Sequence, residues 1–239
     1  MYYHQFMQQN RILAALQAPE LNEVMPHLQW VRLDAGTRAA LAGESPRHIW
    51  FPVDGTIALF HQHESGVATG VAVIGNEGMF SVAQVLGGRS MPYEAVVETS
   101  GYFFRIEART LTDLIAQMRL STTTFLLYAQ ATLTQIAQSV ICSRQHSLHQ
   151  QFCQLLLLIA DKSCSLEFDL TQAAIAGILG VRRVSVTEVA RDLRLQGVID
   201  YARGHLRINN RDGLKARCCE CYDVVGREFD RLLGRQQCP

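Results

Sequence analysis

Apolar residues in the first half of the chain fall in short runs, and turn-forming residues separate these runs. The runs are Ile49–Phe51, Thr56–Phe60, Val67–Ile74, Ala95–Val97 and Tyr102–Ile106, with turns at Asp34–Gly36, Pro52–Gly55, Gly75–Gly78 and Gly87–Gly88. Many short strands with Gly, Pro and Asp turns at this spacing are typical of an antiparallel barrel or sandwich. Before them, Asn10–Leu16 and Pro19–His27 predict two short helices. The sequence therefore predicts a β-rich module from about Trp30 to Arg105.

The periodicity becomes helical near Ala108, and between Leu111 and Ser147 the chain has neither Gly nor Pro. Small and apolar residues follow alternating steps of three and four, at Leu126, Ala129, Leu133, Ile136, Val140, Ser143 and Ser147. That is the a/d spacing of a helix that packs in register against another helix. We predict a homodimer helix with the first five of these residues at its interface. A helix that lies on its own domain would show a similar stripe.

After a further predicted helix, Gln150–Asp161, which Lys162–Ser165 end, the segment Leu170–Arg191 has the spacing of a helix-turn-helix. Ala176 is the small residue required where two helices cross, and Gly180 can take the left-handed backbone of the turn without steric cost. Thr171 is placed to cap the first helix. The apolar framework positions are Ile175, Leu179, Val181, Val186 and Val189. An ordinary helical hairpin would match several of these positions, but here the whole framework is filled.

Polar residues remain on the outer side of the second helix: Arg182, Arg183, Ser185, Thr187 and Glu188. Side chains at the N-terminus of a recognition helix reach base edges and phosphates in the major groove. After Gly197, the segments Val198–Tyr201 and His205–Ile208 predict a hairpin that forms a wing. Three basic residues of this wing, Arg203, His205 and Arg207, are placed to contact backbone phosphates.

Composition and charge narrow the class of protein. The chain has 239 residues, of which 48% are hydrophobic and 18% charged, so it is globular. Its longest aliphatic run, Leu155–Ile159, is far shorter than the ~20 residues that a membrane span needs, and its first residues show no secretory signal. We therefore expect a cytoplasmic protein. Residues 170–239 hold 12 Lys and Arg against 8 Asp and Glu, which favours a partner that carries phosphates.

Cysteine and histidine are the candidates for metal binding. Cys218, Cys219 and Cys221 resemble half of a metal site, but no second Cys or His pair is evident at ligand spacing. The residues that could share one face are Cys142, Cys153 and Cys164 on a single long helix, His61 with His63 on a strand, and His146 with His149 on a helix. Packing is the commoner role of such residues. We predict no metal ion and no cofactor.

These motifs together resemble the Crp/Fnr family of bacterial transcription regulators, over nearly the whole chain. The resemblance rests on Phe51–Gly55, Ile74–Gly78, the long central helix and the winged segment Leu170–Ile208. It implies an α+β fold with an N-terminal antiparallel β-roll of the cyclic-nucleotide-binding type (a cupin-like jelly roll) over residues 1–107. A dimerisation helix over 108–148 and a DNA-binding winged helix-turn-helix over 149–239 would follow.

The predicted effector site departs from the family pattern. Ala83 stands where cyclic-nucleotide sensors carry the Glu that holds the ribose, and Pro92–Tyr93 where they carry the Arg and hydroxyl residue that hold the phosphate; Arg89–Ser90 lies a few residues too early. The oxygen sensors of the family bind an iron–sulfur cluster through cysteines near the N-terminus, whereas the first cysteine here is Cys142. We expect an unidentified small effector, or none.

The recognition helix departs from the pattern as well. By resemblance, Arg183 would read guanine, Ser185 would contact a base or phosphate, and Thr171 and Gln172 would contact phosphates. Val184 replaces a Glu that reads cytosine, and Glu188 replaces a second Arg. Because valine can contact a thymine methyl group but cannot accept a hydrogen bond from cytosine, we expect a half-site unlike the commonest one of the family.

The sequence thus predicts a homodimeric, sequence-specific transcription regulator. Its expected partners are palindromic double-stranded DNA, a second copy of the chain and, for an activator, RNA polymerase. The alternative is a ligand-binding sensor whose helix-turn-helix mediates only protein contact. An enzyme is disfavoured because the sequence shows no nucleophile elbow, phosphate loop or paired acid/base signature.

Overall fold

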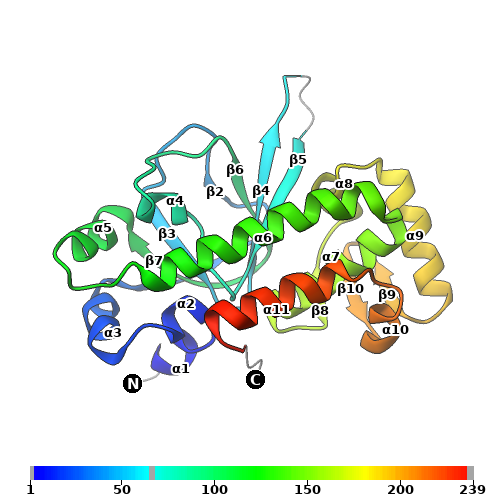
Figure 1. The fold of residues 1–239 in the computed structure, drawn as a ribbon. Coiled ribbons are helices and arrows are strands. Elements are labelled where there is room, and N and C mark those ends of the chain that lie inside the picture. Colours follow the sequence, from blue (N-terminus) through cyan, green and yellow to red (C-terminus); the bar gives the residue numbers. More distant parts are fainter. Residues whose placement is uncertain (1–2, 65–67, 236–239) are drawn as a thin grey trace.

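The computed structural model describes residues 3–64 and 68–235, and it shows a β-rich N-terminal half and a winged C-terminal half with helices between them (Figure 1). Within this described part, no helix is both long and apolar enough to cross a bilayer.

Antiparallel strands in two sheets form the N-terminal β-roll. They are β1 (Gln29–Leu33), β2 (Arg38–Ala40), β3 (His48–Pro52), β4 (Thr56–Gln62), β5 (Ala68–Ile74), β6 (Glu94–Thr99) and β7 (Gly101–Glu107). One sheet has the order β1-β7-β3 and the other β2-β6-β4-β5. Ile57, Val97 and Phe103 are buried together in this domain. The predicted β-rich module is confirmed; of its predicted runs, only Val67 lies outside the described residues.

Short helices cover the open end of the roll: α1 (Tyr3–Met7), α2 (Arg11–Ala14), α3 (Ala18–Val24), a 3-10 turn (Met25–His27) and α4 (Val82–Val85). Asn10 joins α2 to the strands. Its side-chain oxygen caps the helix by accepting from the backbone N–H groups of Ile12 and Leu13. Its amide nitrogen donates to the carbonyls of Pro52 and Gly78, at 2.9 and 2.8 Å. The two helices predicted before the strands are confirmed.

Residues 108–148 do not form the single helix that we expected. The helix α5 (Ala108–Ala116) ends just before Met118, whose φ is 57°, and α6 (Thr123–Gln145) begins after a short loop. Glu20 of α3 holds this loop, because its Oε1 accepts a hydrogen bond from the backbone N–H of Ser121 at 2.8 Å. The helix ends here without Gly or Pro, so the sequence carries no local sign of the break.

The winged half begins with α7 (Leu148–Ser163), which contains the predicted helix Gln150–Asp161. The remaining elements are β8 (Glu167–Asp169), α8 (Gln172–Leu179), α9 (Arg183–Leu195), β9 (Ile199–Ala202), β10 (His205–Ile208), α10 (Arg211–Lys215) and α11 (Cys221–Leu233). The sheet order is β8-β10-β9. The predicted wing is confirmed and gains β8 as a third strand.

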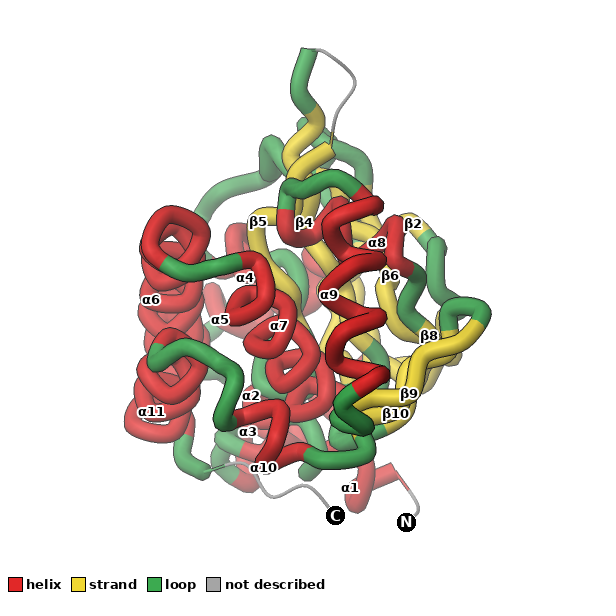
Figure 2. The backbone as a smooth tube through the Cα atoms, turned by 90° about the vertical axis from the view of Figure 1, so that its right-hand side faces the viewer, coloured by secondary structure: helices red, strands yellow, loops and turns green. Residues whose placement is uncertain are grey.

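The two halves are in direct contact at several places, including a buried ion pair between Lys162 of α7 and Glu77 of the β-roll. The helix α8 lies on β5 so closely that a Cβ at Gly70 would be 2.6 Å from the backbone of Ile178. The helix α11 packs along α6, where the rings of Phe229 and Tyr128 are 6.4 Å apart (Figures 1 and 2). The winged half is therefore held by both the β-roll and the central helix.

Two expectations about shared helix faces were wrong. Cys142 lies on α6, whereas Cys153 lies on α7 and Cys164 follows its end, so no single helix carries all three. His146 is the C-cap of α6 and His149 lies in the first turn of α7, so these residues do not share a helix face either. The chain turns at His146–Ser147, where Ser147 and Gln150 form a capping box that starts the new helix.

Candidate nucleic-acid interface

The helix-turn-helix has the local geometry that its sequence predicts. The Thr171 hydroxyl caps α8 by accepting from the backbone N–H of Ala174 at 3.1 Å. Gly180 takes the left-handed conformation with a φ of 65°, which costs a glycine nothing. Ile175 and Val186, one from each helix, are completely buried. The apolar framework therefore packs α9 against α8 without using the exposed polar side chains at the start of α9.

The N-terminal end of α9 presents an exposed surface. Arg182 is the N-cap of α9, and Arg183, Thr187 and Glu188 are exposed on its first turns. Val184 is 68% exposed, which is unusual for a valine and places it on the same open surface. In the described part of the chain, no ion pair reaches Arg182 or Arg183. This surface can therefore donate hydrogen bonds and positive charge to a ligand.

Two other predicted contact residues are already bonded to each other. The hydroxyl of Thr187 donates to the side-chain oxygen of Gln172 at 2.6 Å, which links the recognition helix to the start of α8. Ser185 is half-buried, unlike its arginine neighbours. These residues are therefore positioned by the helix pair itself, and Gln172 and Thr187 form one polar unit beside the arginines.

The wing carries less available charge than its sequence suggests. His205 contacts Asp169 at 2.9 Å and Arg207 contacts Glu167 at 2.9 Å, both across to β8. Arg203 differs, because it lies exposed in the turn between β9 and β10 with a φ of 52°. Of the three basic wing residues, Arg203 is thus the one best placed to meet a phosphate. The strand β8, which sequence reasoning missed, supplies the acidic partners of the other two.

Comparisons with known proteins agree with this arrangement. A cyclic nucleotide-binding domain model matches residues 30–118, and a Crp-like helix-turn-helix domain model matches residues 150–217. The chain belongs to the Crp/Fnr family of transcription regulators. Among curated proteins, none matches its sequence significantly.

Solved structures share the fold of this Crp/Fnr regulator at low sequence identity. A CRP-family transcriptional regulator from Thermus thermophilus aligns with a TM-score of 0.63 and 19% identity, over 78% of this chain and 95% of that one. FixK2 from Bradyrhizobium japonicum gives 0.63 and 12%, over 80% and 98%. A putative cAMP-binding regulatory protein from Silicibacter pomeroyi gives 0.61 and 20%, over 89% and 96%.

The central helix of the regulator has an open apolar stripe. Leu126, Leu133 and Val140, which are seven residues apart, are 52%, 68% and 52% exposed. The other two predicted interface residues, Ala129 and Ile136, are half-buried, and Ile136 packs against the β-roll core. The opposite side of α6 is buried through residues such as Tyr128. The stripe is therefore not used by the chain's own fold.

The β-roll holds one buried acid that sequence reasoning missed. Burial raises the pKa of Glu98, on β6, to about 7. The segment that departs from the family cassette lies apart from this residue on the chain: α4 contains Ala83, and the carbonyl of Arg89 accepts from the Gln84 amide at 3.2 Å. No property of Glu98 in the sequence marks it, because its burial comes from the packing of the roll.

Sequence reasoning also missed a group of potential metal ligands. Cys219 and Cys221 lie with Cys142 and His146, so that the second ligand pair is supplied by α6. The available signal was the spacing of Cys142 and His146, four residues apart, which places a residue at the end of a helix next to one in its last turn.

Proposed function

We propose that this Crp/Fnr regulator acts as a homodimer that binds a two-fold symmetric site in duplex DNA, with α9 of each copy in the major groove. The observation that carries the proposal is the open N-terminal surface of α9. There Arg182, Arg183 and Val184 are exposed on a helix whose packing leaves them no role in the fold. Arginine reads guanine through two acceptors, and valine can contact the thymine methyl group.

Dimerisation through α6 is supported by the open stripe of Leu126, Leu133 and Val140. A repeat of seven residues on an exposed helix face is what a parallel helix pair requires. Two copies related by this pairing would present two α9 helices, and half-sites of such dimers are about one helical turn of DNA apart.

Effector control is supported by the contact between α8 and β5. Because Ile178 lies directly on Gly70, a shift of the β4–β5 hairpin would move α8 and with it the reading helix. A small effector bound in the β-roll could thus shift the population of binding-competent dimers.

The proposal is tested by selecting binding sites from a random duplex library with the purified chain at two salt concentrations. We expect an enriched palindrome whose half-sites are about 10 base pairs apart, with affinity that falls steeply as salt rises. Salt-insensitive binding without enrichment, or no binding in either condition, would contradict the proposal and favour a helix-turn-helix that contacts only protein.

The dimer is tested separately by sedimentation equilibrium of Leu133→Glu. A charge in the centre of the stripe should dissociate the dimer, because a carboxylate cannot be buried there without a partner. Leu195→Glu is the matched control, since Leu195 is 82% exposed but lies on α9 outside the stripe. Equal dimer content in the two variants would place the interface elsewhere.

A further inference from the structure

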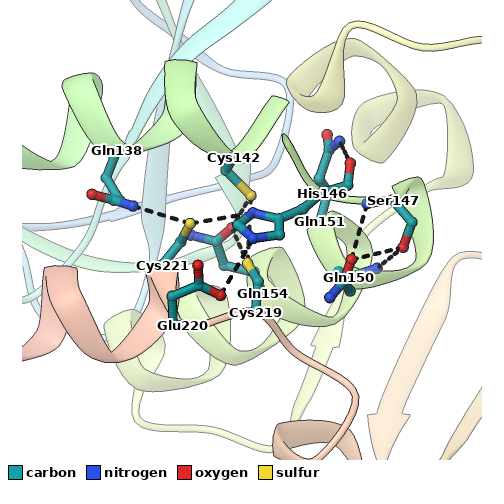
Figure 3. A network of polar contacts seen from close by, with 10 residues as sticks. All are labelled: Gln138, Cys142, His146, Ser147, Gln150, Gln151, Gln154, Cys219, Glu220 and Cys221. Carbon is teal, nitrogen blue, oxygen red and sulfur yellow. Dashed lines mark hydrogen bonds and ion pairs between the residues drawn. The ribbon is translucent and has the colours of Figure 1, made fainter. Parts of the chain in front are cut away.

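Four side chains that are able to bind a metal converge where α6 ends and α11 begins. They are Cys142 in the last turn of α6, His146 at its C-cap, Cys219 just before α11 and Cys221 at its first position (Figure 3). Their ligand atoms all lie within 4.8 Å of one another. The three cysteines are buried and His146 is nearly so, with 12% of its side chain exposed. The cluster is thus an enclosed group with three sulfurs and one imidazole.

The distances fit one tetrahedral ion. The Sγ atoms of Cys142 and Cys219 are 3.5 Å apart, and the Sγ of Cys221 is 3.5 Å from the Nδ1 of His146. Around zinc, with bonds of about 2.3 Å to sulfur and 2.0–2.1 Å to nitrogen, the edges of the tetrahedron are roughly 3.5–3.8 Å. Two of the six distances between ligand atoms therefore match the edges of such a tetrahedron, and all six are within 4.8 Å.

A second layer of polar groups orients the ligands. The Nε2 of His146 faces a carboxylate oxygen of Glu220 at 3.3 Å, which leaves Nδ1 directed toward the sulfurs. This carboxylate–histidine pairing is the usual support of a metal-bound imidazole. The Gln138 amide donates to the Sγ of Cys221 at 3.1 Å, as a thiolate would require (Figure 3). The amide oxygen of Gln154, on α7, accepts from the Cys142 thiol at 2.8 Å, so a third polar side chain lies against the sulfurs.

Other roles account for this arrangement less well. A disulfide needs sulfurs about 2.05 Å apart, and Cys142 and Cys219 are well beyond that distance. A [4Fe–4S] cluster binds each cysteine to a different iron and a [2Fe–2S] cluster divides four ligands between two irons, so both distribute their ligands over more than one metal tetrahedron. Simple packing of thiols would not require an imidazole held by a carboxylate.

We propose that Cys142, His146, Cys219 and Cys221 bind a single thiophilic divalent cation of the Zn²⁺ type. Binding forms three metal–sulfur bonds and one metal–nitrogen bond, and the three thiol protons leave to solvent. The ion then offsets two of the three negative charges of the thiolates, and Glu220 holds the imidazole through its other nitrogen.

The bound ion fixes the joint between the two halves of the regulator. The turn at His146–Ser147 is where the chain passes from α6 into α7, and Cys219 lies between α10 and α11 of the winged half. All four ligands lie outside the ranges 30–118 and 150–217 that the family models match. The site therefore ties the central helix to the winged domain at a place that belongs to this chain rather than to the matched domains. That this joint positions a DNA-reading helix rests on the proposed function.

Metal binding is measured on the full chain without DNA, by titrating the reduced, metal-free protein with Co²⁺. We expect one Co²⁺ per chain, with a thiolate charge-transfer band and the intense visible bands of a tetrahedral ion, both removed by Zn²⁺. Cys142→Ser and Cys219→Ser should lose these bands. Cys218→Ser, adjacent to the ligands but not among them, is the matched control and should bind as the wild type does. Far-ultraviolet circular dichroism verifies that each variant is folded.

Glu220→Gln provides a test that does not depend on folding, because the Glu220 side chain is 75% exposed. We expect Co²⁺ affinity to fall by about 10–100-fold, the usual effect of losing such a partner. Zn²⁺ should also slow hydrogen exchange in residues 142–150 and 218–222 of the wild type and not of Cys219→Ser.

Equal Co²⁺ binding by the wild type and Cys219→Ser, a loss in Cys218→Ser alone, or iron with acid-labile sulfide in place of one divalent ion would each overturn the site. Unchanged hydrogen exchange on Zn²⁺ binding would overturn its role at the joint. Since DNA is absent from these measurements, a chain that binds Co²⁺ but selects no DNA sequence would refute the proposed function alone.

Discussion

The winged helix-turn-helix and the cysteine–histidine cluster are built in opposite ways. In the first, the residues that matter are contiguous from Thr171 to Ile208, and a capping hydroxyl and a left-handed glycine fix the shape locally. In the second, two ligand pairs meet although Cys142 and Cys219 are 77 residues apart. One site presents exposed side chains on a preformed scaffold, and the other exists only if α6 and α11 pack together. The winged helix-turn-helix can therefore be predicted from the sequence, whereas the cysteine–histidine cluster cannot.

The largest expected effect on stability comes from weakening the packing of α11 against α6 at a residue that is not part of the cluster. Phe229 is 4% exposed and packs near Tyr128 of α6. We expect Phe229→Ala to lower the free energy of unfolding by about 3–5 kcal/mol, because a buried ring is replaced by a cavity. Co²⁺ affinity should fall as well, although all four ligands remain. Leu195→Ala is the control for both denaturant unfolding and Co²⁺ titration, and unaltered Co²⁺ affinity in Phe229→Ala would mean that the ligand pairs do not depend on this packing.

Glu98 in the β-roll is a second group whose properties depend on tertiary packing, and its effect is on the pH dependence of stability. Burial raises the pKa of Glu98 to about 7, so the folded state holds a proton that the unfolded state releases at lower pH. Stability is therefore greatest below the ordinary carboxyl pKa and is lost as pH rises through about 7. Glu98→Gln should not show this loss. The difference in unfolding free energy between the two proteins should change by about 2–3 kcal/mol between about pH 5 and 8, measured with urea; parallel pH profiles would contradict the prediction.

The smallest effect tests the local half of the comparison. Gly180→Val places a branched residue at a φ of 65°, and its Cβ would lie 3.2 Å from the Thr69 side chain. We expect a loss of about 1–2 kcal/mol in stability and weaker DNA binding, with unchanged Co²⁺ affinity. Gly226→Ala is the matched control, because Gly226 is inside α11 with open space around it and should gain stability from the better helix former. Lower Co²⁺ affinity in Gly180→Val would show that the two sites are not independent.

What the sequence predicted and what it missed follow the same division. Thr171, Gly180 and the wing were predicted because their structure depends on near neighbours in the chain. The break between α5 and α6 was missed, since it contains neither Gly nor Pro and its loop is bonded to Glu20 of another helix. The acidic partners of His205 and Arg207 were missed because β8 is only three residues long. The pairing of Cys142 with His146 had a readable spacing, but its meaning required the neighbouring α11.

The central claim is that α9 reads bases while the wing contacts the DNA backbone. It is tested most directly by measuring the affinity of the protein for a selected duplex and for every variant of it with one base pair changed. The measurement compares the wild type with Arg183→Ala and Arg203→Ala. We predict that Arg183→Ala costs about 1–3 kcal/mol and removes discrimination at one base pair in each half-site. Arg203→Ala should weaken all sequences equally and lower the salt dependence. If Arg183→Ala instead weakens every duplex by the same factor and keeps the sequence preference intact, α9 does not read the site through this residue.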